Sequence, residues 1–103
     1  MNFHEKKVLV LGSGETGISM AKWLSYLGAH LLLADSRISP PNQSFFDDLI
    51  PPQKRFFGHF NLKLLENIDA IVISPGVPLA ESLVQEAFKR NLPVFGDIEL
   101  FAL

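Results

Sequence analysis

The sequence predicts an α/β fold, a Rossmann-like, doubly wound, five-stranded and mostly parallel sheet with helices on both faces. Short apolar runs, typical of strands buried on both faces, alternate with helical or loop segments along the chain. The first run leads into glycines with the spacing G-x-G-x-x-G, as in dinucleotide-binding folds. Polar residues follow the second and fourth runs, where the carboxyl ends of parallel strands would form a ligand site.

Composition limits the classes of protein to which the chain can belong. Its 103 residues are 48% hydrophobic and 19% charged, which predicts one soluble domain over residues 1–103. A net charge of -2 without a basic run argues against nucleic acid, and no apolar stretch approaches the ~20 residues of a membrane span. The chain has no cysteine, and its three histidines are scattered, so we expect no metal site. Without a secretory signal, we expect a cytoplasmic protein.

The first predicted strand is residues 8–11, followed by a turn over residues 12–17. From Thr16 onward apolar residues recur at helical spacing. Gly28 stands where a helix usually ends in a left-handed residue. These signals together predict the first βα unit of the fold.

The remaining elements follow from shorter patterns. Further strands are expected at residues 30–34, 55–58, 70–74 and 93–96. Four prolines make residues 35–54 a loop with one short helix around 45–50, and residues 61–67 suit another short helix. The helix at 81–90 should end at Asn91, and Asp97 should cap a last helix in "IELFAL". Packing in the core and loops is the role expected of five phenylalanines: Phe45, Phe46, Phe56, Phe57 and Phe60.

The glycine loop is the first candidate ligand site. Gly12 would allow the tight turn, Gly14 would let the backbone approach a phosphate, and Gly17 would let the helix pack closely. The helix N-terminus directs unpaired N–H groups toward the same place, where Thr16 adds a hydroxyl. We favour phosphate binding over a turn that only needs glycine geometry. Glu15 would repel a phosphate unless its carboxylate points outward.

Asp35 ends the second strand, 18 residues after Gly17. An acid there commonly accepts hydrogen bonds from the ribose of NAD, which supports an alternative function as the NAD(P)-binding module of a dehydrogenase. The adjoining Ser36 and Arg37 favour a different ligand, because a carboxylate, a hydroxyl and a guanidinium together can hydrogen-bond the edge of a base such as uracil. The alternative is a turn aspartate beside solvated neighbours.

Ser74, Pro75 and Gly76 end the fourth strand, where the Gly76 backbone can approach a sugar or base. An ordinary turn is the alternative here. The glycine loop, Asp35 to Arg37 and this segment lie far apart in the sequence, and a parallel sheet would bring them together. The chain has no nucleophile elbow, no P-loop and no catalytic carboxylate pair, so we predict no catalytic residue.

Four segments in this order resemble the N-terminal domain of the Mur ligases: "VLVLGSGETG", "ADSR", "IVISPGVP" and "PVFGDIELF". The resemblance covers nearly all of the chain and is closest to the family members that add D-glutamate. Its most specific part is "SPG" followed about 20 residues later by "GDIELF". It implies a Rossmann-like domain that binds the UDP part of UDP-N-acetylmuramoyl-L-alanine (UDP-MurNAc-L-Ala), not NAD.

The resemblance also implies a role for each site residue. The diphosphate region would meet Gly14, the Glu15 backbone, Thr16 and Gly17. Uracil would be held by Asp35, Ser36 and Arg37, and the uridine would contact Ser74 and Gly76. Family members often have an apolar residue in place of Glu15 and threonine in place of Ser36. Neither difference removes the implied contact, because the first uses the backbone and the second keeps a hydroxyl.

A full-length Mur ligase is longer than this chain. The resemblance implies that it would use ATP and Mg²⁺ to phosphorylate the substrate carboxylate, after which D-glutamate attacks the acyl phosphate, in bacterial peptidoglycan synthesis. That machinery belongs to a central P-loop domain and a C-terminal domain, and no G-K-[ST] sequence occurs in these 103 residues. The chain is therefore expected to bind substrate without a cofactor and without catalysis. A structural or regulatory domain without a ligand is a third possibility.

Overall fold

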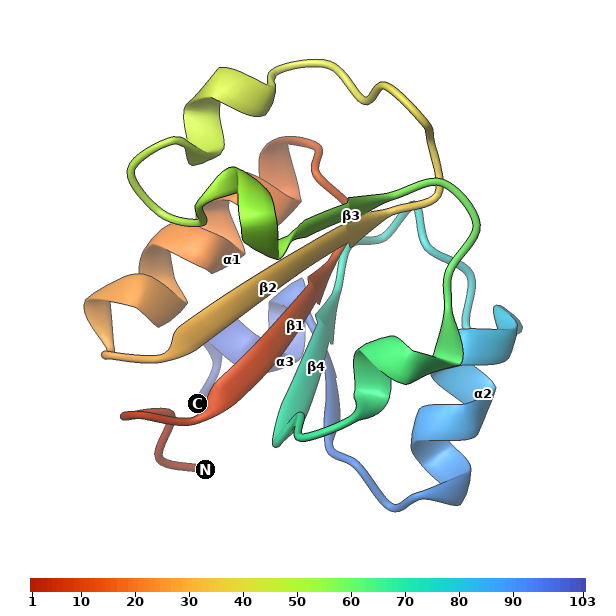
Figure 1. Ribbon diagram of the computed structural model, residues 1–103. Helices are drawn as coiled ribbons and strands as arrows, with labels where there is room; N and C mark the ends of the chain where they lie inside the picture. Colours follow the sequence, from red (N-terminus) through yellow and green to blue (C-terminus); the bar gives the residue numbers. More distant parts are fainter.

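The computed structural model describes all 103 residues and contains five parallel strands between two helical layers (Figure 1). The strands are β1 (Lys7–Leu11), β2 (His30–Asp35), β3 (Arg55–Phe57), β4 (Ala70–Ile73) and β5 (Val94–Gly96). The α-helices are α1 (Glu15–Tyr26), α2 (Ser82–Lys89) and α3 (Asp97–Phe101). Single turns of 3₁₀ helix are η1 (Gln43–Phe46), η2 (Pro52–Lys54) and η3 (Leu62–Leu65).

The strand order is β3-β2-β1-β4-β5, and every pair is parallel. Strand β1 is central, so that Val10 lies opposite Leu33 of β2 and Val72 of β4. The chain adds β2 and β3 on one side of β1 and then crosses to the other side for β4 and β5. The carboxyl ends of β1, β2 and β4 therefore meet at the topological switch point, where ligands bind in open α/β sheets. The predicted fold class is confirmed.

Each face of the sheet has its own hydrophobic core. One core packs α1, α3 and the segment 43–50 against alternate strand residues such as Val10 and Val72. The other packs α2 and η3 against the intervening residues, including Leu9 and Ile71. Because both faces are covered, β4 and residues 8–11 of β1 are continuously apolar, and this is why their sequences predicted them well.

Left-handed residues end the two longer helices, as expected. Gly28 has φ +87° after α1, and the next residue, Ala29, donates its N–H to the Leu24 carbonyl at 3.0 Å. Asn91 has φ +58° after α2, and Leu92 donates to the Ala87 carbonyl at 3.0 Å. These bonds satisfy carbonyls that the helix itself leaves free and fix where the chain turns toward β2 and β5.

The expectation that Asp97 caps the last helix is wrong. Gly96 is the N-cap, and α3 begins at Asp97. The Glu99 carboxylate accepts a hydrogen bond from the Gly96 N–H at 3.1 Å, so an acid inside the first turn does the capping. The two predicted short helices also differ in extent. The first is a 3₁₀ turn that ends at Phe46, and the second spans only residues 62–65.

The phenylalanines divide into two groups. Phe46 and Phe60 are buried, as expected. Phe45, Phe56 and Phe57 pack only in part, since they are 59%, 41% and 38% exposed. Two of these three belong to β3, an edge strand that pairs only with β2, so the sheet covers less of their surface.

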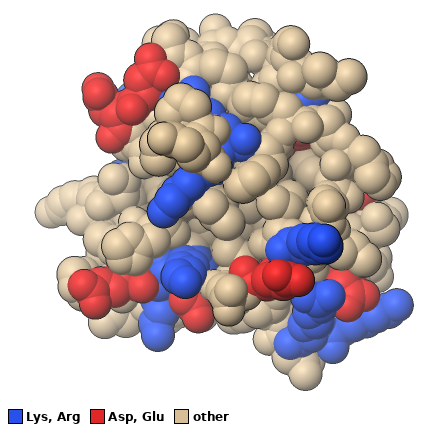
Figure 2. All heavy atoms as spheres, viewed as in Figure 1, with Lys and Arg blue, Asp and Glu red and all other residues tan.

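Charged side chains of both signs are interspersed on the face seen in Figure 2, without a continuous basic stripe. None of the helices combines the length and apolar character that a membrane crossing requires. No three histidine, cysteine or acidic side chains are grouped in a way that could hold a metal ion.

Candidate nucleotide site

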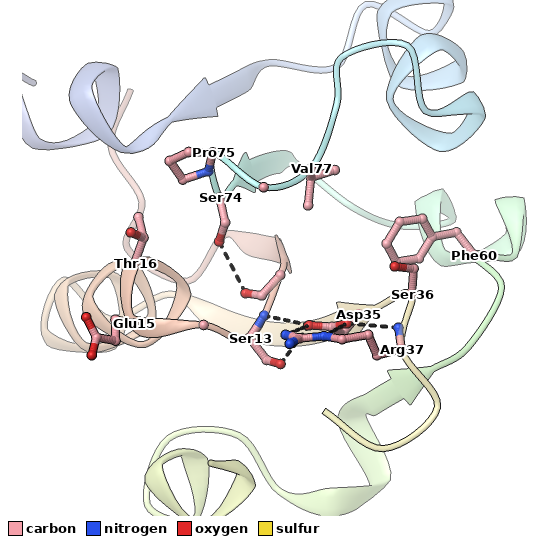
Figure 3. A pocket seen from close by; sticks show the side chains of 13 residues that line it. Ser13, Glu15, Thr16, Asp35, Ser36, Arg37, Phe60, Ser74, Pro75 and Val77 are labelled. Carbon is pink, nitrogen blue, oxygen red and sulfur yellow. Dashed lines mark hydrogen bonds and ion pairs between the residues drawn. The ribbon is translucent and has the colours of Figure 1, made fainter. Parts of the chain in front are cut away.

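An open pocket of about 610 Å³ lies at the carboxyl ends of the central strands. Three segments and one aromatic side chain line it, namely residues 12–16, residues 35–37, residues 74–77 and Phe60. The sheet thus brings together the three segments that the sequence predicted to converge. In Figure 3, Ser13, Asp35 and Arg37 form one wall, and Ser74, Pro75 and Val77 lie across from them. Of the predicted site residues, only Gly17 lies outside the lining.

The glycine loop joins β1 to α1 with the geometry that its sequence indicated. Gly12 has φ +97°, a conformation that side chains disfavour. A Cβ on Gly17 would overlap the Gly12 carbonyl oxygen, so Gly17 permits close packing and contributes no surface to the pocket. A Cβ on Gly14 would meet nothing within 4 Å. The backbone at Gly14 is therefore open to a ligand, while Gly12 and Gly17 shape the turn.

The first turn of α1 is available to an anion. Gly14 is the N-cap, and no side chain caps the helix. The N–H groups of the first turn have no partner within the helix and point toward its N-terminal end. Thr16 lines the pocket next to them, and the exposed Glu15 carboxylate extends away from Asp35 and Arg37 (Figure 3).

Asp35 accepts more hydrogen bonds than any other side chain of the site. It is only 4% exposed, and five donors reach its two carboxylate oxygens. Oδ2 accepts hydrogen bonds from the Ser13 N–H at 3.0 Å, the Ser13 hydroxyl at 2.7 Å and Arg37 Nη2 at 2.8 Å. Oδ1 accepts from the Arg37 N–H at 2.9 Å and from Arg37 Nε at 3.0 Å. Asp35 therefore joins the glycine loop to the end of β2.

These donors also determine the charge of the site. Burial alone would raise the pKa of the Asp35 carboxyl, but the hydrogen bonds from Arg37 and Ser13 outweigh it and hold that pKa well below its ordinary value. The bond to Asp35 raises the pKa of Arg37 in turn. Both side chains are ionised at neutral pH, and the Arg37 side chain remains 53% exposed. The surface offered to a ligand on this wall is thus the guanidinium rather than the carboxylate.

The hydrogen bonds of Asp35 leave little capacity for binding the ribose of a dinucleotide. A carboxylate has about four lone-pair positions for hydrogen bonds, and the five donors already occupy those of Asp35. A ribose diol that used Asp35 would have to displace Ser13 or Arg37. Neighbouring Ser36 is exposed and lines the pocket, so its hydroxyl is accessible to a ligand.

Sequence reasoning missed two lining residues that matter for the geometry. Ser13 is 1% exposed and binds Asp35, although it is an unspecified position of the glycine motif. Phe60 was assigned to packing; it does pack, being 7% exposed, but its ring also lies beside Ser36 at the pocket (Figure 3). A signal for Ser13 existed, because a hydroxyl in this loop faces the end of the neighbouring strand. Nothing local to Phe60 indicated its place.

The family follows from the sequence match. Residues 6–96 match the model of the family described as "Mur ligase MurD-like, N-terminal domain", which is most of the chain and includes every candidate site residue. This chain belongs to the MurD-like N-terminal domain family of the Mur ligases.

Curated relatives of this MurD-like domain carry the name UDP-N-acetylmuramoylalanine--D-glutamate ligase. The protein of Nitrosomonas europaea is 55% identical over 103 residues, which is 100% of this chain and 22% of the relative. The protein of Nitrosospira multiformis is 50% identical over 102 residues, or 99% of this chain and 22% of the relative. The chain thus spans about a fifth of the length of these curated relatives.

Solved structures confirm the fold of the MurD-like domain. The UDP-N-acetylmuramate:L-alanyl-gamma-D-glutamyl-meso-diaminopimelate ligase from Neisseria meningitides matches with a TM-score of 0.69 at 19% identity, over 89% of this chain and 28% of that one. Shikimate dehydrogenase from Aquifex aeolicus matches with a TM-score of 0.64 at 14% identity, over 97% of this chain and 45% of that one. A ligase and a dehydrogenase share this architecture, so the fold alone does not select the ligand.

Proposed function

We propose that this MurD-like domain binds the UDP moiety of UDP-N-acetylmuramoyl-L-alanine. The observation that carries the proposal is the Asp35–Arg37 ion pair at the switch point. It presents a half-exposed guanidinium beside the accessible Ser36 hydroxyl, and these donors suit the carbonyl edge of a pyrimidine base. The names of the relatives, which act on a UDP-linked muramoyl substrate, support the same ligand.

Different residues of the pocket meet different parts of the ligand. The diphosphate region lies at the open backbone of Gly14, the Glu15 N–H and Thr16, where an uncapped helix N-terminus favours an anion. Gly17 contributes indirectly by allowing α1 to approach the loop. Uracil lies against Asp35, Ser36 and Arg37. Asp35 acts largely through its ion pair with Arg37, which orients the guanidinium.

The uridine contacts the opposite wall of the pocket. Gly76 has open space where a Cβ would stand, so a sugar can approach its backbone. Ser74 is 8% exposed, and its hydroxyl lies 3.4 Å from the Gly12 carbonyl, a long hydrogen bond that a ligand can replace. Phe60 and Val77 complete an apolar boundary around the base and the sugar.

We further propose that the chain is the substrate-recognition part of a longer cytoplasmic ligase of peptidoglycan precursor synthesis. ATP and Mg²⁺ would supply acyl-phosphate chemistry in the remaining length of such a ligase. The residues of this chain do not fit that role, since they contain neither a P-loop lysine nor a cluster of acids. The chain alone therefore binds its substrate without catalysing ligation.

Isothermal titration calorimetry of the 103-residue chain tests this proposal. UDP-MurNAc-L-Ala, UDP and NADH are titrated separately at the same ionic strength. We expect saturable binding of both UDP compounds and none of NADH. Saturable binding of NADH without binding of UDP compounds would instead identify the NAD(P)-binding module of a dehydrogenase, and no binding of any of the three would contradict the proposal.

A further inference from the structure

Ser13 connects two segments that are distant in sequence, namely the end of β2 at the pocket and η1 outside its lining. Its hydroxyl donates to Asp35 Oδ2 at 2.7 Å and accepts from Gln43 Nε2 at 3.3 Å. Gln43 begins η1, in the proline-rich segment that follows β2. A hydrogen-bonded chain thus runs from η1 through the glycine loop to Asp35 and Arg37. In Figure 3, Ser13 lies directly against the Asp35–Arg37 pair.

The donor-to-acceptor direction of this series of hydrogen bonds is determined by the groups at its two ends. Asp35 is ionised and can only accept, so the Ser13 proton points toward it, and the Ser13 lone pairs face the Gln43 amide. Ser13 also donates its backbone N–H to the same carboxylate oxygen at 3.0 Å. Two donors from one residue fix the rotation of the Asp35 carboxylate about its side-chain bonds.

The rotation of the carboxylate in turn sets the plane of Arg37. Arg37 donates from Nε to Oδ1 and from Nη2 to Oδ2, a bidentate pair whose two planes must align. Since the Arg37 side chain is 53% exposed, little else holds it in place. Ser13 therefore controls an exposed recognition group that it does not itself touch.

We propose that Ser13 is a positioning residue that makes this pocket selective for a uridine nucleotide over a dinucleotide, an inference that rests on the proposed function above. It does so in two ways. It occupies an acceptor position on Asp35 that a ribose diol would need, and it holds the Arg37 guanidinium in the plane that meets the base. Gln43 supports it from η1.

The test compares Ser13→Ala and Gln43→Ala with the unaltered chain. Ser19→Ala, on the exposed side of α1, and Ser44→Ala, exposed in η1, are the matched controls. Calorimetry gives the dissociation constants for UDP-MurNAc-L-Ala and NADH, well below the unfolding midpoint of each variant. The ¹H–¹⁵N signal of Arg37 Nε reports the geometry of the ion pair directly.

We expect Ser13→Ala to bind UDP-MurNAc-L-Ala about tenfold more weakly, the loss typical of one hydrogen bond to a charged group, and to gain saturable NADH binding that the unaltered chain lacks. Its Arg37 Nε signal should move, Gln43→Ala should show a smaller change of the same kind, and both controls should match the unaltered chain. Equal affinity of Ser13→Ala and the unaltered chain for UDP-MurNAc-L-Ala, or no NADH binding by Ser13→Ala, overturns this inference alone. Failure of the unaltered chain to bind UDP-MurNAc-L-Ala overturns the proposed function and this inference with it.

Discussion

Asp35 stays charged inside the protein because five donors compensate for the water that it has lost. A buried carboxylate without partners costs several kcal/mol and normally takes up a proton. Here Ser13 and Arg37 supply backbone and side-chain donors to both oxygens. The same bonds tie the glycine loop to β2, so that one residue both stabilises the fold and shapes the pocket.

Asp35→Asn should lower the free energy of unfolding by about 2–3 kcal/mol at pH 7, because the amide group directs N–H donors at other donors. The pKa of Asp35 is lower in the folded chain than its ordinary value of 3.8, so the stabilisation is complete well above pH 4 and is lost as pH falls below it. Urea unfolding at pH 7, 5 and 3 should therefore show the gap between the two proteins narrowing only at the lowest pH. Asp48→Asn, at an exposed acid without a hydrogen bond, serves as the control. A gap of the same size at pH 3 would contradict this account of Asp35.

Gly17→Ala and Gly14→Ala separate the two uses of glycine in the loop. A Cβ on Gly17 overlaps the Gly12 carbonyl, so the substitution should cost about 2–3 kcal/mol of stability. A Cβ on Gly14 meets open space, so its cost should stay near or below 1 kcal/mol, the difference between glycine and alanine as N-cap. Affinity for UDP-MurNAc-L-Ala should fall in Gly14→Ala, where the methyl group faces the diphosphate region. Thermal unfolding and calorimetry measure the two effects, and a reversed order of stability would refute the assignment.

For single residues, the sequence predicted the conformational roles of the glycines better than it predicted the hydrogen bonds of the side chains. The turn at Gly12 and the close packing at Gly17 follow from glycine spacing after a strand. The saturation of Asp35 does not, because it depends on Ser13 and Arg37 adopting particular side-chain orientations. The N-cap of α3 was mispredicted for a similar reason, since the sequence does not reveal whether Glu99 folds back onto Gly96.

Among the elements, the segment from η1 to Ile50 depends on Arg55 of β3. This guanidinium is 7% exposed and donates to the Ile50 carbonyl at 2.8 Å, the Gln43 carbonyl at 3.3 Å and Asp47 Oδ1 at 3.1 Å. Phe46 and Ile50 of this segment are fully buried. Arg55 therefore holds in place the segment that brings Gln43 to Ser13.

Arg55→Ala should destabilise the chain by about 2–3 kcal/mol, because it leaves two carbonyls without a donor. Arg55→Lys should recover part of the loss, since an ammonium group does not reproduce the fork of donors. Hydrogen exchange should accelerate at the amides of Leu49 and Ile50, which bond to the Phe46 carbonyl. Arg90→Ala, which removes an exposed ion pair with Glu86, should cost about 0.5 kcal/mol or less. Equal costs for Arg55→Ala and Arg90→Ala would contradict the role given to Arg55.

The accuracy of the sequence prediction varied between elements for a physical reason. Strands β1, β2 and β4 are buried on both faces, so their apolar runs were visible in the sequence. The segment 38–54 contains four of the seven prolines, and its conformation depends on tertiary contacts with Arg55. Only a short helix could be predicted there, and its position was displaced by a few residues.

For the whole molecule, the central fact is that a parallel sheet brings three distant segments to one pocket. A ligand that bridges them binds only the folded chain, so it should raise the free energy of unfolding by about 2.7 kcal/mol at a concentration 100 times Kd. For a domain of this size the midpoint of thermal unfolding should then rise by about 10 °C. Differential scanning calorimetry with UDP-MurNAc-L-Ala checks this, with NADH at the same concentration as the control. An equal rise with both ligands would exclude selective binding.

The most direct test of the account is an NMR titration of the ¹⁵N-labelled chain with UDP-MurNAc-L-Ala, because it locates the ligand as well as detecting it. We predict saturable shifts that are concentrated in three places at once: the amides of Gly14 to Gly17, those of Ser36 and Arg37, and that of Gly76. UDP alone should reproduce them in large part, and NADH should not. Shifts confined to other parts of the molecule, or saturable shifts with NADH in place of the UDP compounds, would contradict the claim that this pocket recognises a uridine nucleotide.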